Sequence, residues 1–338
     1  MASPGPRRTA AAAVAVACLA VLGGCSGGGS GPAGDGGAET DRTRAPSSSP
    51  ATEAAPSVEV GAGPVGVAAG DDGSVWVVGS GADQVVRIPP GSDEPDLVVD
   101  VPGTPLRVAV DDAAAWVTSF RGERLVRIDT ATGRVTDRLR TGAGPEGVTT
   151  GFGAVWLVEQ DAGRLVRVDP RTRRVTARAD IGVGSRLVAA GREALWVAAF
   201  ADDRVLRVDP RTLEVTRGPK VCSGPQGMAE LDGRLWVACT FDDRVVAIDP
   251  ATLRATAEID VPGLPDSVVA HDGRLLVVAE EGPRLVVVDP GSASVVDEVV
   301  LGDATALYDS ANLDVAVAGD EVWVTSFTSD LVHHVPVP

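Results

Sequence analysis

The hydrophobic positions from residue 57 onward repeat with a period of forty residues. A tryptophan occupies the same place in five successive units, Leu276 takes that place in the sixth, and a tryptophan returns in the seventh: Trp76, Trp116, Trp156, Trp196, Trp236 and Trp323. Within each unit, short apolar runs are separated by glycine or by Asp-Pro. A fixed period of this length indicates an array of repeated supersecondary units rather than two independent domains.

The unit at residues 144–181 predicts four short β-strands, at 148–150, 155–159, 165–168 and 175–181. Asp169-Pro170 separates the third strand from the fourth, and Asp followed by Pro favours a type I turn. Consecutive apolar residues at 155–158 predict a strand that is buried on both faces. Short strands repeated in this way are typical of a β-propeller, so we expect an all-β fold of seven four-stranded blades, with an open solenoid as the alternative.

The two ends of the repeat favour a closed ring over the solenoid. After Trp323 the chain provides a second and a third strand but no fourth, whereas residues 57–60 align with the ends of fourth strands at 100–101 and 260–261. We therefore predict that 57–60 completes the blade formed by 315–338. Such closure leaves no unpaired sheet edge.

Composition narrows the class of partner. Hydrophobic residues make up 44% of the chain and aromatic residues only 4%, so Val, Ala and Leu must form the core. The net charge of −17 repels nucleic acid and anionic lipid headgroups, and we expect neither as a direct partner. We expect the domain to be a monomer.

The N-terminus has the pattern of an export signal. Arg7 and Arg8 precede an apolar stretch at 9–22 that is too short to span a bilayer. The following Leu22-Gly23-Gly24-Cys25 resembles the bacterial lipobox, which implies that Cys25 is lipidated and becomes the first residue of the mature protein. The alternative is a plain secretory signal with an incidental cysteine.

These features predict three regions: a lipoprotein signal peptide at 1–24, a flexible tether rich in Gly, Ser and Pro at 25–56, and a propeller at 57–338. Membrane attachment would come from the lipid on Cys25, because acyl chains in combination hold a protein stably. The expected location is the outer face of the bacterial cytoplasmic membrane.

Two cysteines lie within the repeats. Cys239 falls near the end of a second strand, and Cys222 falls in the loop that leads into the first strand of the same unit. Both positions belong to one face of a propeller, and an extracytoplasmic compartment is oxidising. We predict a disulfide between them, with two separate buried thiols as the alternative.

The repeats differ most where each inner strand begins, at the mouth of the expected channel. Polar or charged residues occupy this position or the next one in six units: Arg107, Glu146, Arg186, Gln226, Asp266 and Asp314. Four phenylalanines fall at the same face, after the tryptophan position: Phe120, Phe200, Phe241 and Phe327. Polar groups framed by aromatic rings predict a site for a small molecule or a peptide. The alternative is a salt-bridged plug with aromatic caps.

The spacing between units increases by seven residues only at 301–314, LGDATALYDSANLD. This loop leads into the inner strand of the last blade, so we expect Tyr308 and Asp309 to line the mouth as well.

Arginines also recur at equivalent positions, four of them eleven residues after a tryptophan: Arg87, Arg127, Arg167 and Arg207. Because they recur around the ring, we interpret them as structural, pairing with the recurrent aspartates or with neighbouring blades. An anion site is the alternative.

Gly63-Pro64-Val65-Gly66, Gly144-Pro145-Glu146-Gly147 and Gly224-Pro225-Gln226-Gly227, each followed by a VWVV-like strand, resemble the repeats of virginiamycin B lyase-like propellers. RVVAIDPATLRATAEI, at 244–259, resembles the YVTN/YncE-type repeat. The first resemblance implies a Mg²⁺-dependent ring-opening elimination with a histidine base at the mouth. His271, His333 and His334 all fall elsewhere, so that base has no counterpart.

We therefore expect a binding or scaffold module for an unknown protein, peptide or small molecule. The alternative is a lyase or lactonase that holds Mg²⁺ or Ca²⁺ at acidic mouth residues, with Glu146 or Asp266 as the base.

Overall fold

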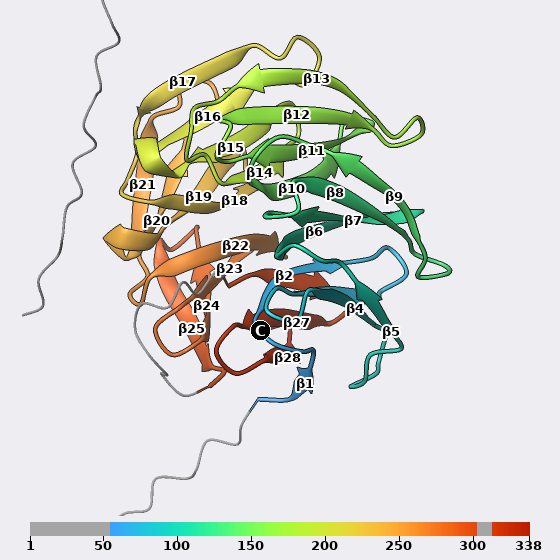
Figure 1. Ribbon diagram of the computed structural model, residues 1–338. Helices are drawn as coiled ribbons and strands as arrows, with labels where there is room; N and C mark the ends of the chain where they lie inside the picture. The colour runs from blue at the N-terminus through green and yellow to red at the C-terminus, as the bar shows by residue number, and fades with distance from the viewer. Residues whose placement is uncertain (1–54, 303–312) are drawn as a thin grey trace, which may run out of the picture. The chain divides into compact units, whose positions relative to one another are not determined.

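The computed structural model describes residues 55–302 and 313–338. These residues form seven four-stranded antiparallel sheets, which are the blades of a β-propeller arranged around a common axis (Figure 1). The predicted fold class is confirmed, and the open solenoid is wrong because the last sheet contains the first strand. Within the described ranges, no helix has the length and apolarity needed to cross a bilayer.

We number the blades along the chain and give the strands of each from the inside outwards. Blade 1 contains β2 (Pro64–Ala69), β3 (Val75–Gly79), β4 (Gln84–Ile88) and β5 (Leu97–Asp100). Blade 2 contains β6 (Pro105–Asp111), β7 (Ala114–Ser119), β8 (Arg124–Asp129) and β9 (Val135–Arg140). Blade 3 contains β10 (Pro145–Gly151), β11 (Ala154–Glu159), β12 (Arg164–Asp169) and β13 (Arg174–Asp180). Blade 4 contains β14 (Leu187–Ala190), β15 (Leu195–Ala199), β16 (Arg204–Val208) and β17 (Val215–Lys220).

The remaining blades follow the same order. Blade 5 contains β18 (Pro225–Leu231), β19 (Arg234–Cys239), β20 (Arg244–Ile248) and β21 (Ala255–Asp260). Blade 6 contains β22 (Pro265–His271), β23 (Arg274–Ala279), β24 (Arg284–Asp289) and β25 (Ser294–Val300). Blade 7 contains β26 (Val315–Ala318), β27 (Glu321–Ser326), β28 (Leu331–Pro336) and β1 (Ser57–Glu59). Two 3₁₀ turns, Phe200–Asp202 and Thr240–Asp242, follow β15 and β19.

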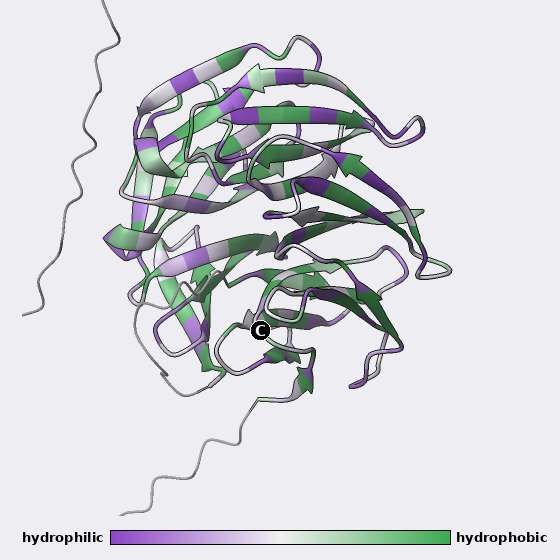
Figure 2. Ribbon diagram, in the orientation of Figure 1, coloured by the Kyte–Doolittle hydropathy of each residue, from purple (hydrophilic) through white to green (hydrophobic). Residues whose placement is uncertain are grey.

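The hydrophobic core lies between neighbouring blades. Every residue of β11 is buried, because the second strand of a blade has sheets on both sides. The outer strand β13 alternates exposed and half-buried positions, and its hydropathy alternates accordingly (Figure 2). One core cluster joins Trp76 and Val78 of blade 1 to Ala115 and Val117 of blade 2. Each blade is therefore stabilised mainly by burial against its neighbours.

Blade 7 closes the ring as the sequence predicts. β1 pairs antiparallel with β28, placing Val58 opposite Val332. The Asp330 carboxylate accepts a hydrogen bond from the Gly63 backbone N–H at 2.9 Å, and the Thr325 hydroxyl donates to the Val65 carbonyl at 3.0 Å. These bonds join residues more than 250 positions apart, so closure is reinforced on the mouth side of the ring.

The inner strand of blade 3 is longer than the predicted 148–150, because β10 begins at Pro145 and passes through a register shift before Val148. Similar shifts interrupt the inner strands of blades 1, 2, 5 and 6. Such bulges redirect side chains at the end of a strand. Here they lie at the residues where the blades differ most.

The Asp-Pro dipeptides form turns, as expected. In the turn after β12, the Asp169 carboxylate accepts hydrogen bonds from the backbone N–H groups of Arg171 and Thr172 at 2.8 and 2.9 Å. These bonds hold the pKa of Asp169 below its usual value. The recurrent aspartate therefore stabilises the turn locally.

The predicted disulfide joins Cys222 and Cys239, with a Cα–Cα distance of 5.8 Å. It links β19 to the loop that leads into β18, as the sequence indicates. Cys25, the signal at 1–24 and nearly all of the tether at 25–56 lie outside the described residues, and they stay predictions.

Candidate functional site

The predicted mouth residues lie at the starts of the inner strands, one from each of blades 2 to 7. Glu146, Gln226 and Asp266 are 2% exposed or less, and Arg107 is 6% exposed. Their blades bring them to one end of the channel because every inner strand runs in the same direction from the mouth. Charged side chains are seldom buried to this extent without a partner.

Two contacts join neighbouring blades across the mouth. Arg186 Nε donates to Glu146 Oε1 at 3.2 Å, which links blade 4 to blade 3. Gln226 Nε2 donates to Asp266 Oδ1 at 2.5 Å, which links blade 5 to blade 6. The predicted salt-bridged plug is therefore present in part.

The pairs leave polar atoms unused. Among the described residues, no hydrogen-bond partner is found for Arg107 Nη1, Glu146 Oε2, Gln226 Oε1 or Asp266 Oδ2. A buried polar atom without a partner costs roughly 1–3 kcal/mol. The four atoms, one donor on Arg107 and three oxygens, are thus poised for further hydrogen bonds.

A cavity of about 190 Å³ lies in the channel below the mouth. Arg107, Ser267 and Asp314 line it together with apolar side chains such as Val148 and Met228. Its polar groups therefore lie among the start positions of the inner strands, and its remaining lining is largely apolar.

Asp314 is occupied by structural bonds. Its Oδ1 accepts from the Ser267 hydroxyl at 2.9 Å and from the Val315 backbone at 3.0 Å. Its Oδ2 accepts from the Val67 backbone at 3.2 Å. The side chain thus fastens blade 7 to blades 6 and 1.

Burial shifts the acid–base behaviour of two mouth carboxyl groups. Desolvation raises the pKa of Asp266 to about 7, although the charges of Arg107 and Arg186 act in the opposite direction. Desolvation, together with the negative charge of Asp266, raises the pKa of Glu280 to about 8. Both groups therefore exchange protons near neutral pH.

Glu280 was not among the residues expected from the sequence, although a signal for it exists. It stands four residues after the tryptophan position, where blades 2, 4 and 7 carry phenylalanine. Comparing charge as well as aromaticity at that position would have identified it, because no other blade has an acid there.

The predicted aromatic rim is only partly assembled. Phe200 and Phe241 meet edge to face at 5.6 Å between centroids, and the Arg186 guanidinium lies 4.7 Å from the centre of the Phe200 ring. Phe241 is 61% exposed. Phe327 packs against the core between blades 6 and 7, and Phe120 has no ring contact with the other three in the described structure.

Tyr308 and Asp309 lie outside the described residues, so their place at the mouth stays a prediction. The histidines are away from the mouth, as expected. His271 ends β22 at the opposite end of the inner strand, and His333 and His334 lie on β28.

The described residues contain no group of three or more His, Cys, Asp or Glu side chains arranged to hold a metal ion. Glu146, Asp266 and Asp314 each accept a bond from a different neighbour and do not converge as a ligand set. Within residues 55–302 and 313–338, the mouth carboxylates are therefore not arranged as the Mg²⁺ or Ca²⁺ site that the sequence suggested as an alternative.

Comparison with known proteins supports the fold. No family model and no curated protein matches the chain. A solved streptogramin B lyase matches with a TM-score of 0.69 at 15% identity, covering 81% of this chain and 93% of that one. Virginiamycin B lyase from Staphylococcus aureus matches with a TM-score of 0.68 at 17% identity, covering 82% and 95%. BamB from Moraxella catarrhalis matches with a TM-score of 0.59 at 14% identity, covering 80% and 82%.

At these identities the likeness shows a shared architecture alone. The similarity to virginiamycin B lyase-like propellers is confirmed at the level of the fold. The YVTN/YncE-type resemblance stays a prediction. Because a likeness at this level does not transfer an activity, the function has to be argued from the mouth itself.

Proposed function

We propose that the protein is a binding module on the outer face of a bacterial cytoplasmic membrane, held there by lipid on Cys25, with a polar ligand-binding site at the channel mouth. The observation that supports the site is the group of buried, unpartnered atoms of Arg107, Glu146, Gln226 and Asp266. A ligand that bonds to them removes their desolvation cost.

The available atoms define the ligand chemistry. Glu146 Oε2 and Gln226 Oε1 are acceptors, and Asp266 becomes a donor in its protonated form. Arg107 Nη1 is a donor. A small molecule or peptide terminus with both N–H donors and a carbonyl or carboxylate satisfies this set. Exposed Phe241 beside Phe200 offers an apolar contact at the rim.

The binding proposal is tested by thermal-shift screening of the full chain with amino acids, short peptides and uncharged polar controls. A ligand of the proposed class should raise the melting temperature in proportion to the logarithm of its concentration. Glu146→Gln and Gln226→Leu should each reduce that rise. If no compound of the class stabilises the wild type, the mouth is a structural plug.

The membrane attachment needs a separate test, because Cys25 is a prediction from the lipobox resemblance. Cells expressing the wild type should incorporate an alkyne fatty acid into the protein and retain it in the membrane fraction. Cys25→Ser should lose the label and release the protein from the membrane. A labelled Cys25→Ser protein would contradict lipidation at this residue.

A second candidate function is a lyase or lactonase, and the raised pKa values of Asp266 and Glu280 are the observation that favours it. A carboxyl group that titrates near neutral pH suits general acid–base catalysis. The test is ring opening of quinupristin by the full chain, with and without Mg²⁺, followed by mass spectrometry. Turnover that Asp266→Asn abolishes would replace the binding proposal.

A further inference from the structure

The arginines that recur after the tryptophans provide an internal comparison around the ring. Each lies directly opposite a tryptophan on the neighbouring strand, in the pairs Trp76–Arg87, Trp116–Arg127, Trp156–Arg167 and Trp196–Arg207. In the first three pairs the guanidinium lies over the indole ring, 5.5 to 5.9 Å from its centroid. Such cation–π contacts stabilise the pair.

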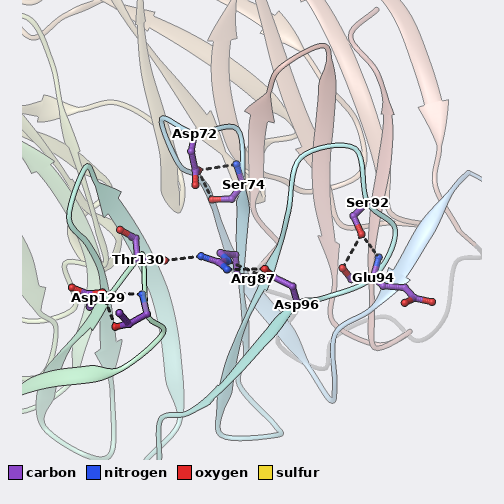
Figure 3. A network of polar contacts seen from close by, with 9 residues as sticks. Asp72, Ser74, Arg87, Ser92, Glu94, Asp96, Asp129 and Thr130 are labelled. Carbon is purple, nitrogen blue, oxygen red and sulfur yellow. Dashed lines mark hydrogen bonds and ion pairs between the residues drawn. The ribbon is translucent and has the colours of Figure 1, made fainter.

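Two of these arginines are also tied by hydrogen bonds. Arg87 forms a bidentate pair with Asp96 and donates to the Thr130 carbonyl of blade 2 at 2.6 Å (Figure 3). Arg127 donates to the Thr136 hydroxyl at 2.7 Å and to the Ala113 carbonyl at 3.3 Å. Arg87 thus bonds to a neighbouring blade, as the structural interpretation expects, whereas Arg127 bonds only within its own blade.

Arg207 departs from the pattern. Within the described part of the chain, it has no ring contact, hydrogen bond or ion pair. Thr216 occupies the place of Thr136, yet no bond joins its hydroxyl to Arg207. A guanidinium and a hydroxyl that are bonded together in blade 2 are therefore both free in blade 4.

The two side chains line a cavity of about 560 Å³ between blades 4 and 5, at the end of the blades opposite the mouth. Arg192 and Trp196 line it from blade 4, and Glu230 and Pro250 from blade 5. The equivalent cavity between blades 2 and 3, beside the engaged Arg127, measures about 410 Å³.

Two carboxylates line this cavity, those of Glu193 and Glu230, and the carboxylate of Glu230 is already satisfied. Glu230 Oε1 accepts from the Trp196 indole N–H at 2.5 Å, and Oε2 accepts from the Arg192 backbone N–H at 2.8 Å. The Arg207 guanidinium and the Thr216 hydroxyl are thus unused donors inside the cavity, and the exposed side chains of Arg192 and Glu193 also line it. A guanidinium matches the geometry of a carboxylate or phosphate because it donates two parallel N–H bonds.

We propose that the cavity between blades 4 and 5 is a second binding site, which takes a small organic anion through its carboxylate or phosphate group. Arg207 binds the anionic oxygens and Thr216 donates beside it, while Trp196 and Pro250 form the wall of the cavity. The site is independent of the channel mouth, since it uses other residues at the opposite end of the blades.

The test is isothermal titration of the full chain with citrate and with inorganic phosphate, together with NMR of the arginine Nε–H signals. Saturable binding of at least one probe should move the Arg207 signal. Arg207→Gln should weaken the affinity by roughly tenfold or more, since it removes charge-assisted hydrogen bonds. Arg127→Gln is the matched control, because it removes the equivalent arginine from a groove where that arginine is engaged.

The two variants should separate binding from stability. Arg127→Gln should lower the melting temperature and leave the affinity unchanged. Arg207→Gln should weaken the affinity and leave the melting temperature unchanged. Absence of saturable binding for both probes at millimolar concentration would overturn the proposal. Equal loss of affinity in the two variants would overturn it too, because it would indicate general charge attraction. A failure at this site leaves the mouth proposal untouched.

Discussion

Asp266 and Glu280 show how burial changes the acid–base chemistry of a carboxyl group, with neighbouring charges adding smaller effects. Glu280 is half-buried, and Asp266 is fully buried against Gln226. The folded protein therefore retains protons on these groups at a pH where the unfolded chain has lost them. Because the folded chain binds more protons than the unfolded chain, folding becomes less favourable as the pH rises.

This linkage predicts the pH dependence of stability. An aspartate in the unfolded chain has a pKa of 3.8, whereas the pKa of Asp266 in the folded protein is about 7. Its contribution to the free energy of unfolding therefore falls as the pH rises from about 4 to about 7, and above that window the loss is complete. Asp266→Asn cannot ionise and keeps an oxygen for Gln226, so the variant should be more stable than the wild type at pH 8 and similar at pH 4.

Chemical denaturation at several pH values checks this expectation. Asp297→Asn, on the exposed face of β25, is the control and should not alter the pH dependence. The Glu280 carboxyl signal gives a second measurement, because removal of the Asp266 charge should lower the pKa of Glu280. An unchanged Glu280 titration in Asp266→Asn would contradict the coupling.

The inner strands show why glycine alternates with larger residues around the channel. At the repeat position of Gly66 the blades carry, in ring order, Gly66, Arg107, Gly147, Leu187, Gly227, Ser267 and Asp314. A Cβ on Gly147 would lie 2.6 Å from the Arg186 carbonyl and 2.7 Å from the Leu187 Cα of the next blade. Each glycine thus lets the following inner strand approach closely.

Gly147→Ala should therefore destabilise the fold by about 2 kcal/mol, because the obstructing atoms belong to backbone and the strand itself must move. Gly302→Ala is the control, since its Cβ would meet nothing nearer than 3.5 Å. Urea denaturation of both variants measures the difference. A Gly147→Ala protein as stable as Gly302→Ala would show that the inner strands have room to separate.

The whole ring contains an odd number of blades, so this alternation must fail once. It fails between blades 6 and 7, where Ser267 and Asp314 are neighbours and form a hydrogen bond at 2.9 Å. The seven additional residues of the sequence fall in the loop that joins these two blades. Both departures from the repeat thus occur at the junction where the two inner strands each carry a side chain at this position.

Closure of the ring should depend on the buried side chain of β1. Val58 is 2% exposed in β1, whereas Glu59 beside it is exposed. Val58→Ala should lower the free energy of unfolding by about 2 kcal/mol through lost burial and an unfilled cavity, and Glu59→Ala should change it little. Thermal denaturation checks the pair. If Val58→Ala unfolds like the wild type, β1 contributes little to closure.

The sequence by itself determined the architecture. The forty-residue period, the tryptophan positions and the displaced strand at 57–60 are all visible in the local pattern of residues, without knowledge of any tertiary contact. It also indicated the blade neighbours at the mouth, since Glu146 and Arg186, or Gln226 and Asp266, occupy equal positions in consecutive repeats. It could not indicate which side chains would be paired, buried or left free.

Those outcomes were decided by the tertiary structure. Asp266 and Asp314 are both acidic mouth residues in the sequence. In the structure, burial raises the pKa of Asp266 to about 7, whereas the Asp314 carboxylate accepts hydrogen bonds that join blade 7 to blades 6 and 1. Arg127 and Arg207 occupy equivalent positions in the repeat, yet of the two only Arg127 forms hydrogen bonds with its blade. Solvation and hydrogen bonding depend on neighbours from other blades, and no local pattern specifies them.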